Sequence, residues 1–122
     1  MTAISGKVIS GARYGRQIGF PTANIDRRYY SRRKLKVKLG IYAGIAEVLA
    51  QRFKAGIVIG PLDHRHLPKI EAHLIGFAGN LYGKKITIRL QKYLRPFKKF
   101  KNVEQLKKQI AADIKRISKL NT

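Results

Sequence analysis

With 122 residues the chain is expected to form one domain, residues 1–122, that can bury a single hydrophobic core. Its 44% hydrophobic content excludes a disordered polypeptide, and the absence of cysteine excludes disulfides and thiolate metal sites. The sequence begins without the apolar run of a signal peptide, and no apolar stretch approaches the ~18 residues of a membrane span. We therefore expect a cytoplasmic monomer with no membrane partner.

The charge is strongly unbalanced, because 27 Lys and Arg residues oppose six Asp and Glu residues and give a net charge of +21. Such a field attracts polyanions. The cations concentrate in residues 27–38 and 92–101, and Tyr29 and Tyr30 interrupt the first segment. Basic residues interleaved with aromatic ones can bind nucleic acid, whereas a solvated face is the commoner origin of such runs. We expect non-specific nucleic-acid association that is confined to low salt.

The first apolar run, Gly6–Ser10, is followed by a glycine-rich segment, Gly11–Asn24, that we expect to be an irregular loop. Glycines allow successive backbone N–H groups to converge on anionic oxygens, and a cation within the loop strengthens that preference. The residues of this kind are Gly11, Gly15, Arg16 and Gly19. The segment predicts a phosphate-binding loop, with a glycine-punctuated surface loop as the alternative.

Two short polar residues follow Pro21, which fixes its own backbone angle and favours an extended Phe20. Thr22 and Asn24 are two positions apart, so in an extended segment their side chains point the same way. A hydroxyl and an amide carbonyl are hard oxygen ligands suited to Mg²⁺. A phosphate-binding loop beside Mg²⁺ ligands is what a nucleoside triphosphate site requires.

Further apolar runs predict β-strands in the middle of the chain. They are Gly40–Ala50, Phe53–Gly60, Ile70–Phe77 and Lys85–Tyr93, and the last three carry apolar residues at every second position. Their connections are too short for helical crossovers, so the strands are expected to be antiparallel. Residues 76–83 predict a hairpin-like connection between the last two strands.

One of these strands carries a carboxylate in an otherwise apolar sequence. Ile70 and Ala72 are expected on one face, with Glu71 and His73 on the other. A carboxylate in such a strand is costly to bury, so it is expected to have either a paired cation or a catalytic function. An ion pair with a nearby cation is one interpretation, and the general base of a phosphoryl transfer is the other.

The polar segment before this strand contains Asp63, His64 and His66, a pattern that can ligate zinc together with His73. No clear fourth ligand accompanies these residues. A proline-flanked polar loop is therefore the simpler interpretation.

The end of the chain changes to helical periodicity. Apolar residues recur at three- and four-residue spacing, at Val103, Leu106, Ile110, Ile114 and Ile117. Asn102 followed by Gln105 resembles a capping box at the start of this helix. Several strands and one amphipathic helix predict a mainly β fold, a small closed barrel with the C-terminal helix packed against it.

Residues 15–24, Gly-Arg-Gln-Ile-Gly-Phe-Pro-Thr-Ala-Asn, resemble the signature of the ATP-dependent riboflavin kinase (flavokinase) family. Similar blocks follow in the family's order: Gly40–Ala43, Ile59–Pro61, Ile70–Leu74, Leu81–Gly83 and Leu94–Pro96 with Phe100. The resemblance implies a closed six-stranded antiparallel Greek-key barrel that transfers the γ-phosphate of ATP to the ribityl 5′-hydroxyl of riboflavin, giving FMN and ADP. It also implies a stand-alone kinase, without the adenylyltransferase domain that makes FAD in many bacteria.

The resemblance assigns roles to residues. Glu71 would be the general base, and Thr22 and Asn24 would hold Mg²⁺ and the phosphates of ATP. The loop over the phosphates would consist of Gly11, Gly15, Arg16, Gly19 and Pro21. Lys7 is a further candidate for phosphate contact, Tyr82 would border the adenine and Arg95 the flavin.

The chain departs from the family pattern on the expected flavin side. Val58 stands where the family often has Asn, Leu62 to His64 replace its usual Thr-Phe after the turn, and Phe97 replaces an acidic residue. These changes bear on flavin affinity.

Two alternatives to the kinase remain: a non-catalytic basic barrel that binds nucleic acid, and a flavin or nucleotide carrier without turnover. Formation of FMN distinguishes the three.

Overall fold

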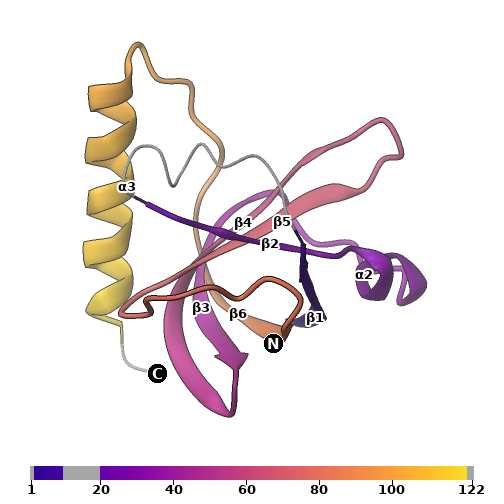
Figure 1. Ribbon diagram of the computed structural model, residues 1–122. Helices are drawn as coiled ribbons and strands as arrows, with labels where there is room; N and C mark the ends of the chain where they lie inside the picture. The colour runs from indigo at the N-terminus through magenta and orange to yellow at the C-terminus, as the bar shows by residue number, and fades with distance from the viewer. Residues whose placement is uncertain (1, 10–19, 121–122) are drawn as a thin grey trace.

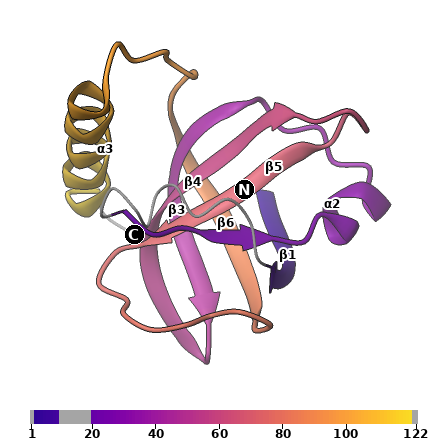
Figure 2. The ribbon, with the colours of Figure 1, turned by 45° about the horizontal axis from the view of Figure 1, so that its top comes forward.

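The computed structural model describes residues 2–9 and 20–120. Its elements follow one another along the chain as β1 (Thr2–Ile9), β2 (Ala23–Ile25), α2 (Arg28–Arg32), β3 (Gly40–Val48), β4 (Gln51–Leu62), β5 (Pro68–Leu74), β6 (Lys85–Arg95) and α3 (Val103–Ser118). The strands close into a barrel in the order β1-β2-β5-β4-β3-β6, and every ladder is antiparallel. Helices α2 and α3 lie on opposite sides of this barrel (Figures 1 and 2). The predicted mainly β fold, a closed six-stranded antiparallel barrel with a C-terminal helix, is confirmed.

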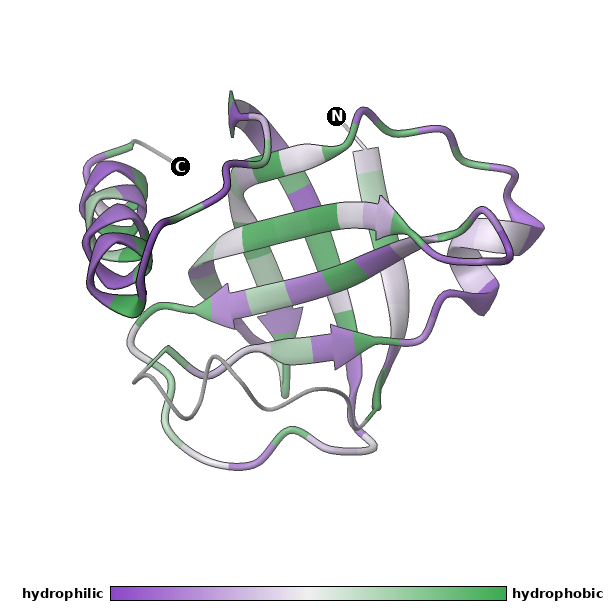
Figure 3. Cartoon of the chain, turned by 90° about the horizontal axis from the view of Figure 1, so that it is seen from above, coloured by the Kyte–Doolittle hydropathy of each residue, from purple (hydrophilic) through white to green (hydrophobic). Residues whose placement is uncertain are grey.

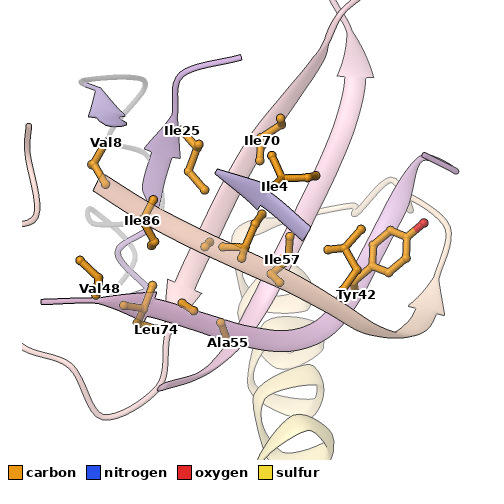
Figure 4. Close-up of a cluster of buried hydrophobic side chains, with 14 of the residues drawn as sticks. Ile4, Val8, Ile25, Tyr42, Val48, Ala55, Ile57, Ile70, Leu74 and Ile86 are labelled. Carbon is orange, nitrogen blue, oxygen red and sulfur yellow. The ribbon is translucent and has the colours of Figure 1, made fainter. Parts of the chain in front are cut away.

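The core fills the inside of the barrel and follows the period of two that the sequence predicted. Strands β4, β5 and β6 alternate buried with more exposed residues. Figure 3 colours the strands by hydropathy, and hydrophobic and hydrophilic residues both occur along them. Side chains such as Ile4, Ile57, Ile70 and Ile86 point into the enclosed space (Figure 4). All four are at most 2% exposed. Burial of each isoleucine contributes about 1.5–3 kcal/mol to the free energy of folding. This core therefore fixes the strands whose other side chains form the outer face of the barrel.

The prediction of an irregular loop over Gly11–Asn24 is wrong at its C-terminal end, because Ala23–Ile25 form strand β2. This short strand pairs with β1 through Ile9 and Asn24, and with β5 through Ala23 and Ala72. Three residues give no periodic signal of their own. Their strand conformation comes from the ladders on both sides, which close the barrel.

The hairpin predicted at residues 76–83 is also wrong. Both edges of β5 are occupied by β2 and β4, and β6 pairs with β1 and β3. The segment therefore connects two strands that are not neighbours. Its end pairs with β1 instead, since the Gly83 N–H donates to the Val8 carbonyl oxygen at 2.8 Å and the Val8 N–H donates to the Lys84 carbonyl oxygen at 2.9 Å.

Helix α2 lies inside the basic segment 27–38. Its Tyr30 is buried in the core, and the Tyr30 hydroxyl accepts a hydrogen bond from the Val37 N–H at 3.0 Å. Periodicity gives no helix signal over five residues. The buried tyrosine fixes this helix against the barrel.

Helix α3 packs on the outside of the barrel through Ile117, which is 2% exposed beside Ile41, Ala43 and Leu94. The Asn102 side chain accepts from the Gln105 N–H at 2.9 Å, which is one half of the predicted capping box. The Gln105 side chain accepts from the Lys101 N–H at 3.2 Å instead of from the Asn102 N–H. The helix is confirmed, but Val103 at its start stays 42% exposed. None of the described helices is long and apolar enough to cross a membrane.

Candidate functional site

Asn24 and Glu71 lie directly opposite each other on neighbouring strands β2 and β5. On its other side Glu71 pairs with Val58 of β4. Ala72, next to Glu71, and Ile57, next to Val58, are buried inside the barrel. Side chains alternate along a strand, so the side chains of Glu71, of Val58 and of the paired Asn24 lie on the outer face. Directly opposed residues have Cβ atoms about 5 Å apart. The structure thus brings together the predicted base and one predicted metal ligand.

Glu71 is a half-buried carboxyl group. Burial raises its pKa, and the positive charge of Lys69 opposes that shift. Within residues 2–9 and 20–120, no Lys, Arg or His nitrogen forms a salt bridge with Glu71. The ion pair weighed from the sequence is therefore not seen in this part of the chain. A carboxylate with a raised pKa is a stronger proton acceptor than an exposed one.

Val58 gives Glu71 an apolar neighbour. The Val58 side chain is partly buried and packs against the cluster of Ile41 and Ile117 under α3. Glu71 is thus flanked by an amide side chain on one strand and by an apolar surface on the other.

The segment Phe20–Thr22 is held beside β5. The His73 Nδ1 lies 2.7 Å from the carbonyl oxygen of Pro21, and the Phe20 and His73 rings meet edge to face with centroids 6.3 Å apart. Thr22 follows directly and is partly buried. Sequence reasoning placed His73 on the Glu71 face but missed its contact with Pro21, because the two residues are 52 positions apart.

Gly11, Gly15, Arg16 and Gly19 lie outside the described residues, so their predicted roles stay predictions. Lys7 is exposed on β1 opposite Lys85 of β6, and its carbonyl oxygen accepts from the Asp26 N–H at 2.9 Å. It is two residues before Ile9, the partner of Asn24.

Tyr82 is 65% exposed and directly precedes Gly83, which is bonded to the end of β1. Tyr82 therefore lies near the end of β1. Its contact with adenine stays a prediction.

Arg95 forms an ion pair with Asp113 of α3. Its Nη2 donates to Asp113 Oδ2 at 2.7 Å, and its Nε donates to the same carboxylate at 3.2 Å. Both side chains are largely buried, at 16% and 12% exposed. The pair fastens α3 to β6, a structural task that the sequence did not reveal. A contact of Arg95 with flavin stays a prediction.

Asp63 organises the connection between β4 and β5. Its carboxylate accepts from Arg27 Nη1 at 2.6 Å and from the N–H groups of Arg65 and Leu67. The Arg27 guanidinium holds the pKa of Asp63 well below its usual range. In the described part of the chain, no three His, Cys, Asp or Glu side chains group as metal ligands.

Two surface hollows lie away from Glu71. One, of about 450 Å³, follows the hairpin of β3 and β4 around Leu49. The other, of about 330 Å³, is lined by Lys36, Lys38, Lys92 and Tyr93 among others. Neither is lined by Asn24 or Glu71. The candidate site is therefore an outer face of the sheet with the segment Phe20–Thr22 beside it, not one of these hollows.

The chain matches the flavokinase family, described as riboflavin kinase, over residues 1–121. It is 39% identical over 116 residues to the bifunctional riboflavin kinase/FMN adenylyltransferase of Escherichia coli (strain K12), covering 91% of this chain and 35% of that protein. It is 33% identical over 123 residues to the RNA-binding riboflavin kinase RibR of Bacillus subtilis (strain 168), covering 98% of this chain and 51% of that protein.

The chain thus spans about a third to a half of the length of these curated relatives. A solved riboflavin kinase from Trypanosoma brucei has the same fold, with a TM-score of 0.73 at 21% identity over 95% of this chain and 74% of that chain. With the barrel, the ordered sequence blocks and the family match in agreement, the chain belongs to the flavokinase (riboflavin kinase) family.

Proposed function

We propose that this chain is a riboflavin kinase that transfers the γ-phosphate of ATP to the ribityl 5′-hydroxyl of riboflavin, giving FMN and ADP. The observation that carries the proposal is the pairing of Asn24 with Glu71 on the outer face of the barrel, where burial raises the pKa of the carboxyl group. Membership of the flavokinase family supports the same reaction.

Glu71 acts as the general base in this proposal. Its carboxylate accepts the proton of the 5′-hydroxyl while that oxygen forms a bond to the γ-phosphorus of ATP. The bond between the γ-phosphorus and the bridging oxygen breaks, and ADP leaves with the bonding electron pair. The raised pKa of Glu71 suits this task, since a desolvated carboxylate takes up a proton more readily.

The residues beside Glu71 fit a magnesium ion bound with ATP. Thr22 and Asn24 offer a hydroxyl and an amide oxygen, and both residues are partly exposed. Asn24 pairs with Glu71, and Thr22 lies two residues before Asn24. A bound Mg²⁺ would neutralise phosphate charge there. Thr22 and Asn24 orient the nucleotide, and Pro21 directs the segment that carries them.

The test is chromatographic detection of FMN after incubation with riboflavin, ATP and Mg²⁺. We expect FMN to form together with an equal amount of ADP, and no FMN to form when ATP is left out. Absence of FMN after long incubation with excess folded protein would rule out the proposed kinase activity and favour a carrier without turnover.

Nucleic-acid binding is a second candidate, favoured by exposed cations in and after α2. Those with no acidic partner in the described structure are Arg32, Arg33, Lys34, Lys36 and Lys38. Of the two tyrosines among them, Tyr30 is buried. Tyr29 is partly buried against the core, and the Arg33 guanidinium lies 4.8 Å from the centre of its ring. One relative is named RNA-binding. For this chain we propose phosphate contacts that salt disrupts.

A further inference from the structure

His73 occupies a position between the predicted base and the segment that leads to the predicted metal ligands. It lies on β5 two residues after Glu71 and on the same outer face. Its Nδ1 is 2.7 Å from the Pro21 carbonyl oxygen. A carbonyl oxygen only accepts hydrogen bonds, so Nδ1 carries the proton and donates. The edge of the Phe20 ring packs against the same imidazole.

This contact and the β2 ladder hold Thr22 from both sides. On one side, the His73 bond fixes the carbonyl of Pro21, which belongs to the planar peptide unit that contains the Thr22 nitrogen. On the other side, Ala23 pairs with Ala72, the residue next to His73. Both attachments come from consecutive residues of β5. The strand that carries Glu71 therefore also sets the place of Thr22.

We propose that His73 is a positioning residue for Mg·ATP: its Nδ1–H anchors the Pro21 carbonyl and thereby presents Thr22 and Asn24 beside Glu71. The inference rests on the proposed kinase function. It gives His73 a task on the nucleotide side of the site, because its hydrogen bond and its ring contact in the described structure are with Pro21 and Phe20.

Two substitutions separate anchoring from mere packing. His73→Asn keeps an N–H donor close to the position of Nδ1, whereas His73→Leu keeps an apolar side chain and loses the donor. Loss of one hydrogen bond that orders the segment is expected to weaken binding of Mg²⁺ with a non-hydrolysable ATP analogue about tenfold in His73→Leu. His73→Asn is expected to recover most of that loss. Riboflavin KM and the melting temperature are expected to stay close to wild type in both.

Calorimetry with the analogue measures this binding without turnover, so it is independent of the kinase assay. Nitrogen-15 NMR of the imidazole gives a second readout, with Nδ1 protonated in the wild type. Equal analogue affinity of His73→Leu and wild type would overturn the inference, as would a loss that His73→Asn does not repair. If wild type makes no FMN while His73→Leu still binds the analogue more weakly than His73→Asn does, the anchor stands and the proposed function fails. If FMN forms and the two variants bind alike, the function stands and the anchor fails.

Discussion

Replacement of Glu71 by glutamine is the sharpest perturbation of the proposed chemistry. Gln has nearly the shape of Glu, and the backbone ladders to Asn24 and Val58 do not depend on the side chain. The amide cannot accept the hydroxyl proton. Loss of a general base lowers rates by about 10²–10⁴, which corresponds to about 3–5 kcal/mol of transition-state stabilisation. We expect kcat to fall by that factor while ATP and riboflavin affinities change little.

The free energy of unfolding should increase in Glu71→Gln at neutral pH, although kcat falls. Burial raises the pKa of Glu71, so the folded protein binds this proton more tightly than the unfolded chain does. The wild type therefore loses stability as the pH rises from the ordinary glutamate pKa through the raised one. Glu71→Gln removes this loss, so the variant should be more stable than wild type at neutral pH. The difference should vanish below the ordinary glutamate pKa.

The assay is FMN formation under saturating substrates, together with thermal unfolding of each protein at several pH values. Glu47→Gln is the matched control, since Glu47 is another half-buried strand carboxylate but is paired with Arg89 at 2.7 Å. It should keep kcat within a few-fold of wild type. A near wild-type kcat for Glu71→Gln would refute the role of Glu71 as base.

Three further changes test other parts of the structure. Thr22→Val and Asn24→Leu should each weaken Mg·ATP binding far more than riboflavin binding in titrations, because each removes a hard oxygen ligand; equal losses for both ligands would indicate a folding defect instead. Asp113→Asn should lower the free energy of unfolding by about 3 kcal/mol in urea denaturation, because it leaves the largely buried Arg95 without its carboxylate; an unchanged midpoint would show that the pair contributes nothing. Neutralising Arg32, Arg33 and Lys34 together should weaken RNA binding at low salt and leave riboflavin turnover within a few-fold, since all three are exposed; sub-micromolar, sequence-preferring binding by the wild-type protein at physiological salt would contradict a solvated basic face.

The sequence predicted those parts of the fold that are visible locally. The period of two placed Ile57, Ile70 and Ile86 inside the barrel, and the same alternation placed Glu71 on its outer face. Helical spacing together with the cap at Asn102 predicted α3. In these segments the apolar residues recur at the spacing of the side chains that the fold buries, so the local sequence was sufficient to predict them.

The parts that local reasoning missed depend on contacts between distant residues. Strand β2 has only three residues and exists through its ladders with β1 and β5. The β5–β6 connection resembled a hairpin, because nothing local shows that both edges of β5 are taken. The bonds from His73 to Pro21 and from Arg95 to Asp113 join residues 52 and 18 positions apart. The pairing of Asn24 with Glu71, which forms the candidate site, is of the same kind.

Transfer of label from [γ-³²P]ATP to riboflavin tests the central claim most directly. The wild-type protein with Mg²⁺ should place the label in FMN, one for each ADP released, and Glu71→Gln should place about 10²–10⁴-fold less there in the same time. Label that appears in inorganic phosphate alone, or FMN that forms equally fast with Glu71→Gln, would contradict a riboflavin kinase that uses Glu71 as its base.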